Sequence, residues 1–114
     1  SVLQGFTLQN GIGNSEDPDG NGSFYTYGGG IYFENSSPVI KNCIIQNNTA
    51  DQGGGGGLFC YNASPVFFEC LILNNTTDDV GGGLYAREDS EPKFYDCIFE
   101  ENTAEFGGGC YLRN

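Results

Sequence analysis

Apolar residues recur at fixed phases along this chain. The segment at residues 28–48 (GGGIYFENSSPVIKNCIIQNN) returns in diluted form at residues 55–75 and 81–102. Three apolar positions follow one another in each copy: Leu3, Ile40, Phe67 and Phe94; then Phe6, Cys43, Cys70 and Cys97; then Leu8, Ile45, Ile72 and Phe99. A second set follows the glycines, with Ile31, Leu58, Leu84 and Cys110 and, two residues later, Phe33, Cys60, Ala86 and Leu112. The chain is therefore a tandem repeat of about 27 residues per unit.

These spacings predict short strands. A spacing of two within a set is typical of a strand, and the spacing of three between Ile40 and Cys43 indicates a bend between two strands. Gly, Asn, Ser and Pro fill the junctions, which leaves no room for a helix. A unit of this size cannot bury its apolar side alone, so it must stack on its neighbours. We therefore predict an all-β fold, a parallel β-helix of about four coils with about three short strands per coil.

Equivalent residues of stacked coils form ladders. An amide ladder is predicted for Asn48, Asn75 and Asn102, with Gly11 at the same position in the first coil. The same spacing of one repeat unit places Cys43, Cys70 and Cys97 in an interior row. Three thiols in a line do not enclose a metal ion, and in-register stacking separates their Cβ atoms too far for a relaxed disulfide. We expect buried free thiols that act as small apolar fillers. A contact of Cys60 with Cys43 or Cys70 across the coil is the alternative.

The chain is predicted to be a single domain, residues 1–114, with a loop insertion at about residues 13–27. Within this loop, Asp17-x-Asp19-x-Asn21-Gly22 matches the opening of a calcium loop, with Glu16 or Glu34 in place of the missing closing Glu. The other interpretation is a solvated turn, which has the same composition. Calcium is the one cofactor that the sequence suggests.

A leucine-rich repeat is the alternative fold. The run from Ile40 to Asn48 also satisfies the template LxxLxLxxN. The residues that follow, TADQGGGGGLFCYNASPV, indicate a glycine turn and a strand, which favours the β-helix.

The repeat also resembles a known family. GGGI or GGGL is paired with an FxxN-type element, which is FEEN at residues 99–102, IQNN at 45–48 and ILNN at 72–75. This pairing resembles the polymorphic outer membrane protein repeat and related right-handed β-helix repeats of secreted bacterial surface proteins. The resemblance implies a right-handed β-helix and an extracellular or cell-surface location, often with an adhesive role. It implies no catalytic residues.

Charge excludes several partner classes. The formal net charge is −11 and the chain has only four Lys and Arg residues, so binding to nucleic acid or to an anionic membrane surface is not expected. No apolar run is long enough to span a bilayer.

A fragment of a polysaccharide lyase or glycoside hydrolase is the alternative function, because such enzymes share this fold. A carboxylate pair would have to converge on one face. The acidic candidates are Asp78, Asp79, Glu88, Asp89, Glu100, Glu101 and Glu105. The chain has no His, and its cations do not cluster with these residues. We therefore expect a solvated acidic surface and no catalytic activity.

Two outward rows suggest contact surfaces. The first is an aromatic ladder, consisting of Tyr32, Phe59, Tyr85 and Tyr111, which could stack on sugar rings or a cell-surface partner, or could simply stack ring on ring between coils. The second is an aliphatic row of Ile44, Leu71 and Ile98, for which we expect lateral packing against another chain. Phe68, Leu73 and Tyr95 extend this apolar exterior.

Sequons for N-glycosylation begin at Asn21, Asn35, Asn47, Asn62, Asn74 and Asn75. Asn35 and Asn62 occupy turn positions and are the better acceptors, whereas Asn75 is expected to be buried. Turns rich in Asn, Ser and Thr also generate such triplets by accident.

The sequence shows no polar cap at either end of the solenoid. The last residues match those from Gly28 to Asn35, and the first match those from Pro38 to Asn48. Copies could therefore stack head to tail into a filament, or the chain could be part of a longer repeat array. The sequence thus predicts an extracellular structural or adhesive module that associates with itself.

Overall fold

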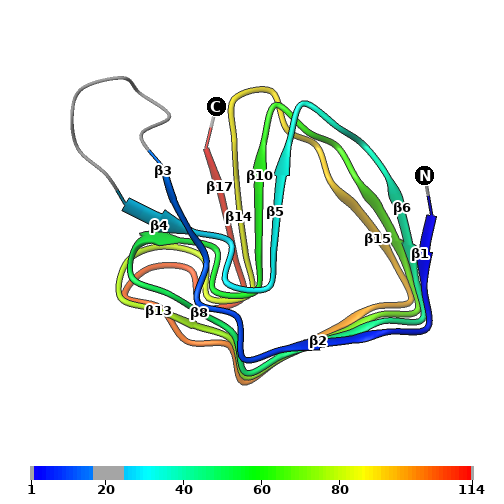
Figure 1. Cartoon of the computed structure of the whole chain (residues 1–114), viewed down its shortest axis with the longest axis horizontal. Helices are drawn as coiled ribbons and strands as arrows, with labels where there is room; N and C mark the ends of the chain where they lie inside the picture. Colours follow the sequence, from blue (N-terminus) through cyan, green and yellow to red (C-terminus); the bar gives the residue numbers. More distant parts are fainter. Residues whose placement is uncertain (1, 17–24, 114) are drawn as a thin grey trace.

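The computed structural model describes residues 2–16 and 25–113, and these residues form strands and turns without a helix. Figure 1 looks along the stacked coils, which lie one behind another around a shared interior. The molecule measures 37 × 26 × 20 Å.

Three parallel sheets form the walls of the solenoid, and each wall receives one strand from each of its four coils. Wall A contains β1 (Val2–Gln4), β6 (Val39–Lys41), β11 (Val66–Phe68) and β15 (Lys93–Tyr95). Wall B contains β2 (Thr7–Gln9), β7 (Ile44–Gln46), β12 (Leu71–Leu73) and β16 (Ile98–Glu100). Wall C contains β5 (Ile31–Glu34), β10 (Leu58–Tyr61), β14 (Leu84–Arg87) and β17 (Cys110–Arg113). The strands pair in the register that the sequence alignment predicts, for example Ile40 with Phe67 and Ile45 with Ile72.

The parallel β-helix predicted from the sequence is confirmed. The alternative of a leucine-rich repeat is wrong, because each repeat supplies strands to three separate walls. A leucine-rich repeat would instead place one strand per repeat on a single concave sheet and follow it with a helix or 3₁₀ turn.

Further short strands lie between walls B and C. β8 (Thr49–Ala50) pairs with β13 (Thr76–Thr77), and β3 (Asn14–Glu16) runs antiparallel to β4 (Tyr25–Tyr27), which in turn runs parallel to β9 (Gln52–Gly54). The insertion predicted as a loop at about residues 13–27 is therefore a strand pair in its described parts. The calcium candidates Asp17, Asp19 and Asn21 lie outside the described residues, as does the sequon at Asn21.

Residues with a left-handed backbone conformation form the corners between the walls. The turn from wall A to wall B has a positive φ at Gly5, Asn42, Glu69 and Asp96. Gly, Asn and Asp tolerate this conformation best, whereas Glu69 adopts it at some cost. Repetition of the same single-residue turn in each coil stacks the walls in register.

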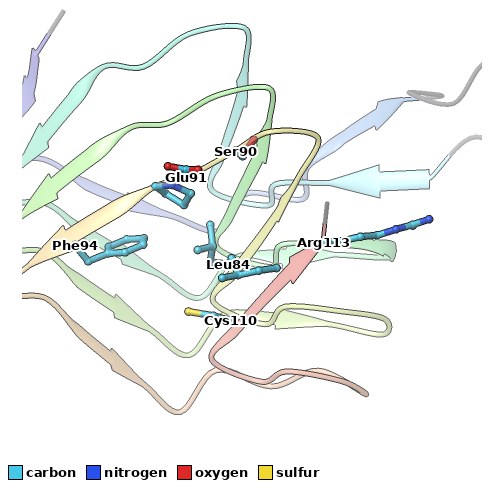
Figure 2. A pocket seen from close by; sticks show the side chains of 8 residues that line it. Leu84, Ser90, Glu91, Phe94, Cys110 and Arg113 are labelled. Carbon is cyan, nitrogen blue, oxygen red and sulfur yellow. The ribbon is translucent and has the colours of Figure 1, made fainter.

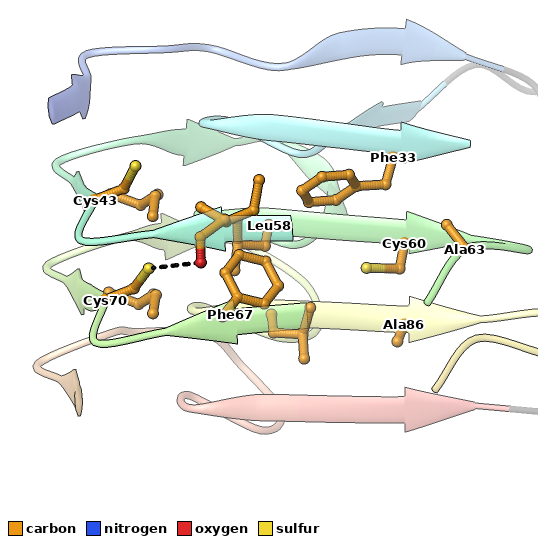
Figure 3. Close-up of a cluster of buried hydrophobic side chains, with 12 residues drawn as sticks. Phe33, Cys43, Leu58, Cys60, Ala63, Phe67, Cys70 and Ala86 are labelled. Carbon is orange, nitrogen blue, oxygen red and sulfur yellow. Dashed lines mark hydrogen bonds between the residues drawn. The ribbon is translucent and has the colours of Figure 1, made fainter. Parts of the chain in front are cut away.

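The core consists of inward rows from the three walls (Figure 3). Its largest buried side chains include Phe67, Ile45, Leu58, Ile72 and Leu84. Phe67 stacks on Phe94 of the next coil at 4.6 Å between ring centroids, with an interplanar angle of 13°. Like residues thus pack on like residues along the axis.

Candidate functional site

The ladder asparagines follow wall B, where the chain turns toward the glycine-rich segment, and their side chains bind neighbouring coils. The main-chain N–H of Asn48 and its Nδ2 both donate to Oδ1 of Asn75, at 3.1 and 3.0 Å. Asn75 repeats the pattern toward Oδ1 of Asn102, at 2.9 and 3.0 Å. Each Nδ2 also donates to a carbonyl oxygen of the preceding coil: Leu8, Ile45 or Ile72. The predicted amide ladder is thus present, and it runs in one direction.

The first coil departs from this ladder. Gly11 donates its N–H to Oδ1 of Asn48 at 2.9 Å, but it has no carboxamide to offer a preceding coil. A Cβ atom on Gly11 would collide with the carbonyl oxygen of Gly29. Glycine is therefore required at this position.

The thiol row lies inside the corner between walls A and B. Cys43 and Cys70 are buried, Cys97 is partly buried, and all five cysteines are free. The Sγ atoms of Cys43, Cys70 and Cys97 each contact the carbonyl oxygen two residues earlier, at 3.3 to 3.4 Å. Cys60 lies in wall C near Ala63 and Ala86, away from Cys43 and Cys70 (Figure 3). The alternative contact of Cys60 across the coil is therefore not formed.

Accessibility predicts the order of thiol modification. Cys110 is exposed, so we expect it to react first with an alkylating reagent, followed by Cys97. Cys43, Cys60 and Cys70 should react only when the protein unfolds. Intact mass measured over time would check this order, and simultaneous labelling of all five thiols would contradict it.

Burial also predicts a pH dependence of stability. Desolvation raises the pKa of Cys60 from an ordinary value of 9.0 to about 12, and it raises the pKa of Cys70 as well. Between these two values the unfolded chain loses the Cys60 proton and the folded chain keeps it, so stability falls as pH rises from 9.0 toward about 12. The variant Cys60→Ala removes this thiol and introduces alanine, which the next coil already has at the equivalent position, Ala86. The fall in stability with rising pH should therefore be smaller in this variant. Urea unfolding at about pH 8 and about pH 10.5 would measure both proteins, and identical pH slopes would contradict the assignment.

The aromatic ladder of Tyr32, Phe59, Tyr85 and Tyr111 is stacked in register, but the prediction that it is an exposed face is wrong. Phe59 and Tyr85 are buried, at 0% and 4% exposure, and Tyr32 and Tyr111 are partly buried. Tyr27 of β4 covers the row and lies 4.5 Å from the Phe59 ring centroid. Val80 packs against the same cluster. Tyr27, Phe59 and Tyr85 therefore form a second core, between wall C and the lobe beside it in Figure 1. A sugar ring could not stack on Phe59 or Tyr85.

The aliphatic row does lie on the outside of wall B. Ile44, Leu71 and Ile98 pair in register, and Ile98 is 51% exposed. On wall A, Phe68 stacks on Tyr95 at 5.1 Å between ring centroids, and Nζ of Lys41 lies 5.8 Å from the Phe68 centroid. An apolar strip thus follows the outer corner between walls A and B, with the acidic turn residues Glu69 and Asp96 along it.

The acidic residues of the described part of the chain form no metal-binding cluster. Among the described residues, no group of three or more His, Cys, Asp and Glu side chains is arranged to hold a metal ion. Glu88 instead pairs with the buried Arg87, whose guanidinium lies 3.6 Å from Oε1 of Glu88 and above the ring of Tyr61. This ion pair lies at the end of wall C.

The sequon asparagines differ in accessibility. Asn35, Asn47, Asn62 and Asn74 are exposed and have positive φ. Asn75 is fully buried, so only the other four described sites present an accessible amide. Nδ2 of Asn62 donates to Oδ1 of Asn35 at 2.7 Å, which links two of them along the axis.

The last coil borders a cavity of about 430 Å³ (Figure 2). Leu84, Phe94, Cys110 and Leu112 form its apolar side, and Glu91 and Arg113 lie at its rim. Leu112 is 68% exposed there, and Phe6 of the first coil is 56% exposed. Apolar side chains of both end coils are therefore accessible.

The described residues contain no helix with the length and apolarity that a membrane crossing requires. Residues 12–114 match a family described as the right-handed β-helix region. Neither the comparison with curated proteins nor the comparison with solved structures gives a match. With nearly the whole chain matched and three parallel walls in the structure, the protein belongs to the right-handed β-helix family.

Proposed function

We propose that the protein is a structural or adhesive β-helix module, located outside the cell or at its surface, that works without catalysis. Its end coils are continued by further β-helix, supplied either by head-to-tail copies or by coils of a longer repeat array. The observation that carries this proposal is the repeat register itself: the first and last strands of all three walls are sheet edges with accessible apolar residues beside them.

Sheet edges and apolar cross-sections favour association. Within residues 2–16 and 25–113, β15, β16 and β17 each have a partner strand on one side only, as do β1, β2 and β5. Exposed strand edges pair readily with another chain, and natural proteins usually cover them. A further coil would satisfy the main-chain groups and bury Leu112 and Phe94 in one step.

The outer surface supports the adhesive part of the proposal. The strip formed by Phe68, Tyr95, Leu71 and Ile98 is apolar and partly exposed on an otherwise acidic protein. Contiguous apolar patches of this kind mark contact surfaces. The net charge of −11 keeps such a module in solution, and membership of the β-helix family is consistent with secretion.

Light scattering and negative-stain microscopy of the purified chain at low and high concentration would test the proposal. Rods that lengthen with concentration, and that are lost in Leu112→Asp but kept in the lateral control Tyr95→Asp, would support stacking of copies. A monodisperse monomer would count against the filament, and the longer repeat array would then be the remaining form of the proposal. Release of reducing ends or unsaturated products from acidic polysaccharides would overturn the non-catalytic role and favour the enzyme alternative.

A further inference from the structure

An asparagine forms the corner after wall B in each of the first three coils. Asn10, Asn47 and Asn74 are exposed, with φ of 63°, 56° and 53°. Asparagine is one of the few residues that adopt this left-handed conformation readily. The residue that follows each corner asparagine occupies the ladder position, namely Gly11, Asn48 or Asn75.

This order of residues bears on the chemical stability of the corner. The main-chain nitrogen that follows an asparagine can attack Cγ of its carboxamide. The N–Cγ bond forms, the Cγ–Nδ2 bond breaks, and ammonia leaves with the proton of the attacking nitrogen. Water then opens the cyclic imide at one of its two carbonyl carbons, which gives aspartate or isoaspartate. The attack is easiest when glycine follows, because glycine has no Cβ atom to hinder it.

Packing places this most reactive pair at the first corner. Asn10 suits the left-handed conformation, and Gly11 follows it. A Cβ atom on Gly11 would collide with the carbonyl oxygen of Gly29, so no bulkier residue could replace it to slow the reaction. The fold therefore retains an Asn–Gly pair on an exposed corner.

The amide ladder holds the attacking nitrogen of this pair. The N–H of Gly11 donates to Oδ1 of Asn48 at 2.9 Å, and the carbonyl oxygen of Gly11 accepts from the N–H of Thr49 at 2.9 Å. The nitrogen must give up its proton and turn toward Cγ of Asn10, which breaks its bond to Asn48. Asn48 is 1% exposed, so water cannot take over as the acceptor unless the coil opens.

The inner corners repeat this protection. The N–H of Asn48, which follows Asn47, donates to Oδ1 of Asn75 at 3.1 Å. The N–H of Asn75, which follows Asn74, donates to Oδ1 of Asn102 at 2.9 Å. In both cases the attacking residue also carries a Cβ atom, so the first corner remains the most reactive of the three.

We propose that Asn10 is a site of spontaneous deamidation whose reaction is gated by the hydrogen bond between Gly11 and Asn48. While this bond holds, Asn10 keeps its amide. Opening of the first coil frees the nitrogen, and water is the only co-reactant. Isoaspartate would insert a Cβ atom into the main chain at the corner, which would move Gly11 away from Asn48. The modification would thus make a transient opening permanent, and the gate does not depend on the filament or repeat array proposed above.

The test follows deamidation of the full chain at neutral pH by peptide mapping. The map separates Asn10 from Asn21, which is also followed by glycine but lies outside the described residues. Asn48→Ala removes the acceptor of the Gly11 N–H. Asn75→Ala is the matched control, because it breaks the same ladder one coil later and leaves Oδ1 of Asn48 in place. Asn10→Gly tolerates the positive φ and removes the reactive amide, so it identifies the signal of this site.

We expect Asn48→Ala to speed deamidation of Asn10 by about tenfold or more, the effect of one net hydrogen bond, and Asn75→Ala to speed it clearly less. A urea series on the unaltered chain gives a second measurement, which decides the matter if circular dichroism shows that either variant is unfolded. Hydrogen exchange of the Gly11 amide and deamidation of Asn10 should then rise by the same factor, because both require the same local opening.

Three results would overturn the inference. The first is equal acceleration by Asn48→Ala and Asn75→Ala while both remain folded. The second is deamidation of Asn10 in buffer as fast as in denaturing urea. The third is a deamidation rate that stays constant at urea concentrations that expose the Gly11 amide to exchange.

Discussion

Replacing Asn75 by alanine is expected to lower the free energy of unfolding by about 3–5 kcal/mol, because several buried polar groups lose their partners at once. The main-chain N–H and Nδ2 of Asn48 would lose their shared acceptor, and the carbonyl oxygen of Ile45 would lose its donor. Asn48 and Asn75 are 1% and 0% exposed, so water cannot replace these bonds without opening the coil. Urea unfolding followed by circular dichroism would measure the change.

Gln46→Ala is the matched control, because it also removes an amide-to-amide hydrogen bond between coils. Nε2 of Gln46 donates to Oε1 of Gln9 at 2.8 Å, but on the outer surface. We expect a change within about 0.5 kcal/mol for this variant. If the two variants were equally stable, the ladder would not be a main stabilising element of the fold.

The second large effect is expected for Gly56→Ala, at about 3 kcal/mol or more of destabilisation, because the added methyl group would meet main-chain atoms on two sides. A Cβ atom on Gly56 would lie 2.6 Å from the carbonyl oxygen of Gly82 and 2.6 Å from both N and O of Thr76. These atoms belong to the neighbouring coil and cannot rotate away as a side chain could. The coils would have to separate locally, which would weaken the main-chain hydrogen bonds at Gly56 and Gly82.

Gly109→Ala is the control for this prediction. It makes the same change in the glycine run of the last coil, at the counterpart of Gly57, where a Cβ atom would have nothing within 4 Å. Its φ is outside the positive range, so alanine should be neutral or slightly stabilising there. Thermal unfolding of both variants would measure the difference, and a similar loss in each would mean that the close approach of the neighbouring coil is not what requires glycine at Gly56.

Most of the fold could be predicted because the repeat determines the strands, the bend between them and the register of the walls. The phases of Ile40, Cys43 and Ile45 place the bend and both strands, and the constant step to Cys70 and Cys97 sets the register of the walls. The amide ladder follows from the same step. These features are local or periodic, so one sequence contains enough information to infer them.

The burial of the aromatic ladder could not be predicted in the same way. The alternation of side chains along β10 correctly predicts that Phe59 lies on the outer side of wall C. A residue on the outer side of a wall is nevertheless buried where another segment covers it. The covering residues, Tyr27 and Val80, lie outside the regular apolar phases, and their position depends on how the segments between walls B and C fold back. The signal available in the sequence was the row itself, since three or four stacked rings are costly to leave in water. The exposed position of Phe6 was likewise hidden, because alignment treats it as the equivalent of a buried cysteine.

The direction of the amide ladder has a consequence for how the protein is made. The Nδ2 of Asn48 and of Asn75 donates to a carbonyl oxygen of the preceding coil, but the main-chain N–H and the second Nδ2 hydrogen bond of each wait for the next coil, which is the one later in the chain. During translation the N-terminal part of a chain emerges and folds first. A ribosome would therefore deliver, coil by coil, the acceptor that the previous coil lacks, so the solenoid can lengthen in step with synthesis without waiting for its last residue.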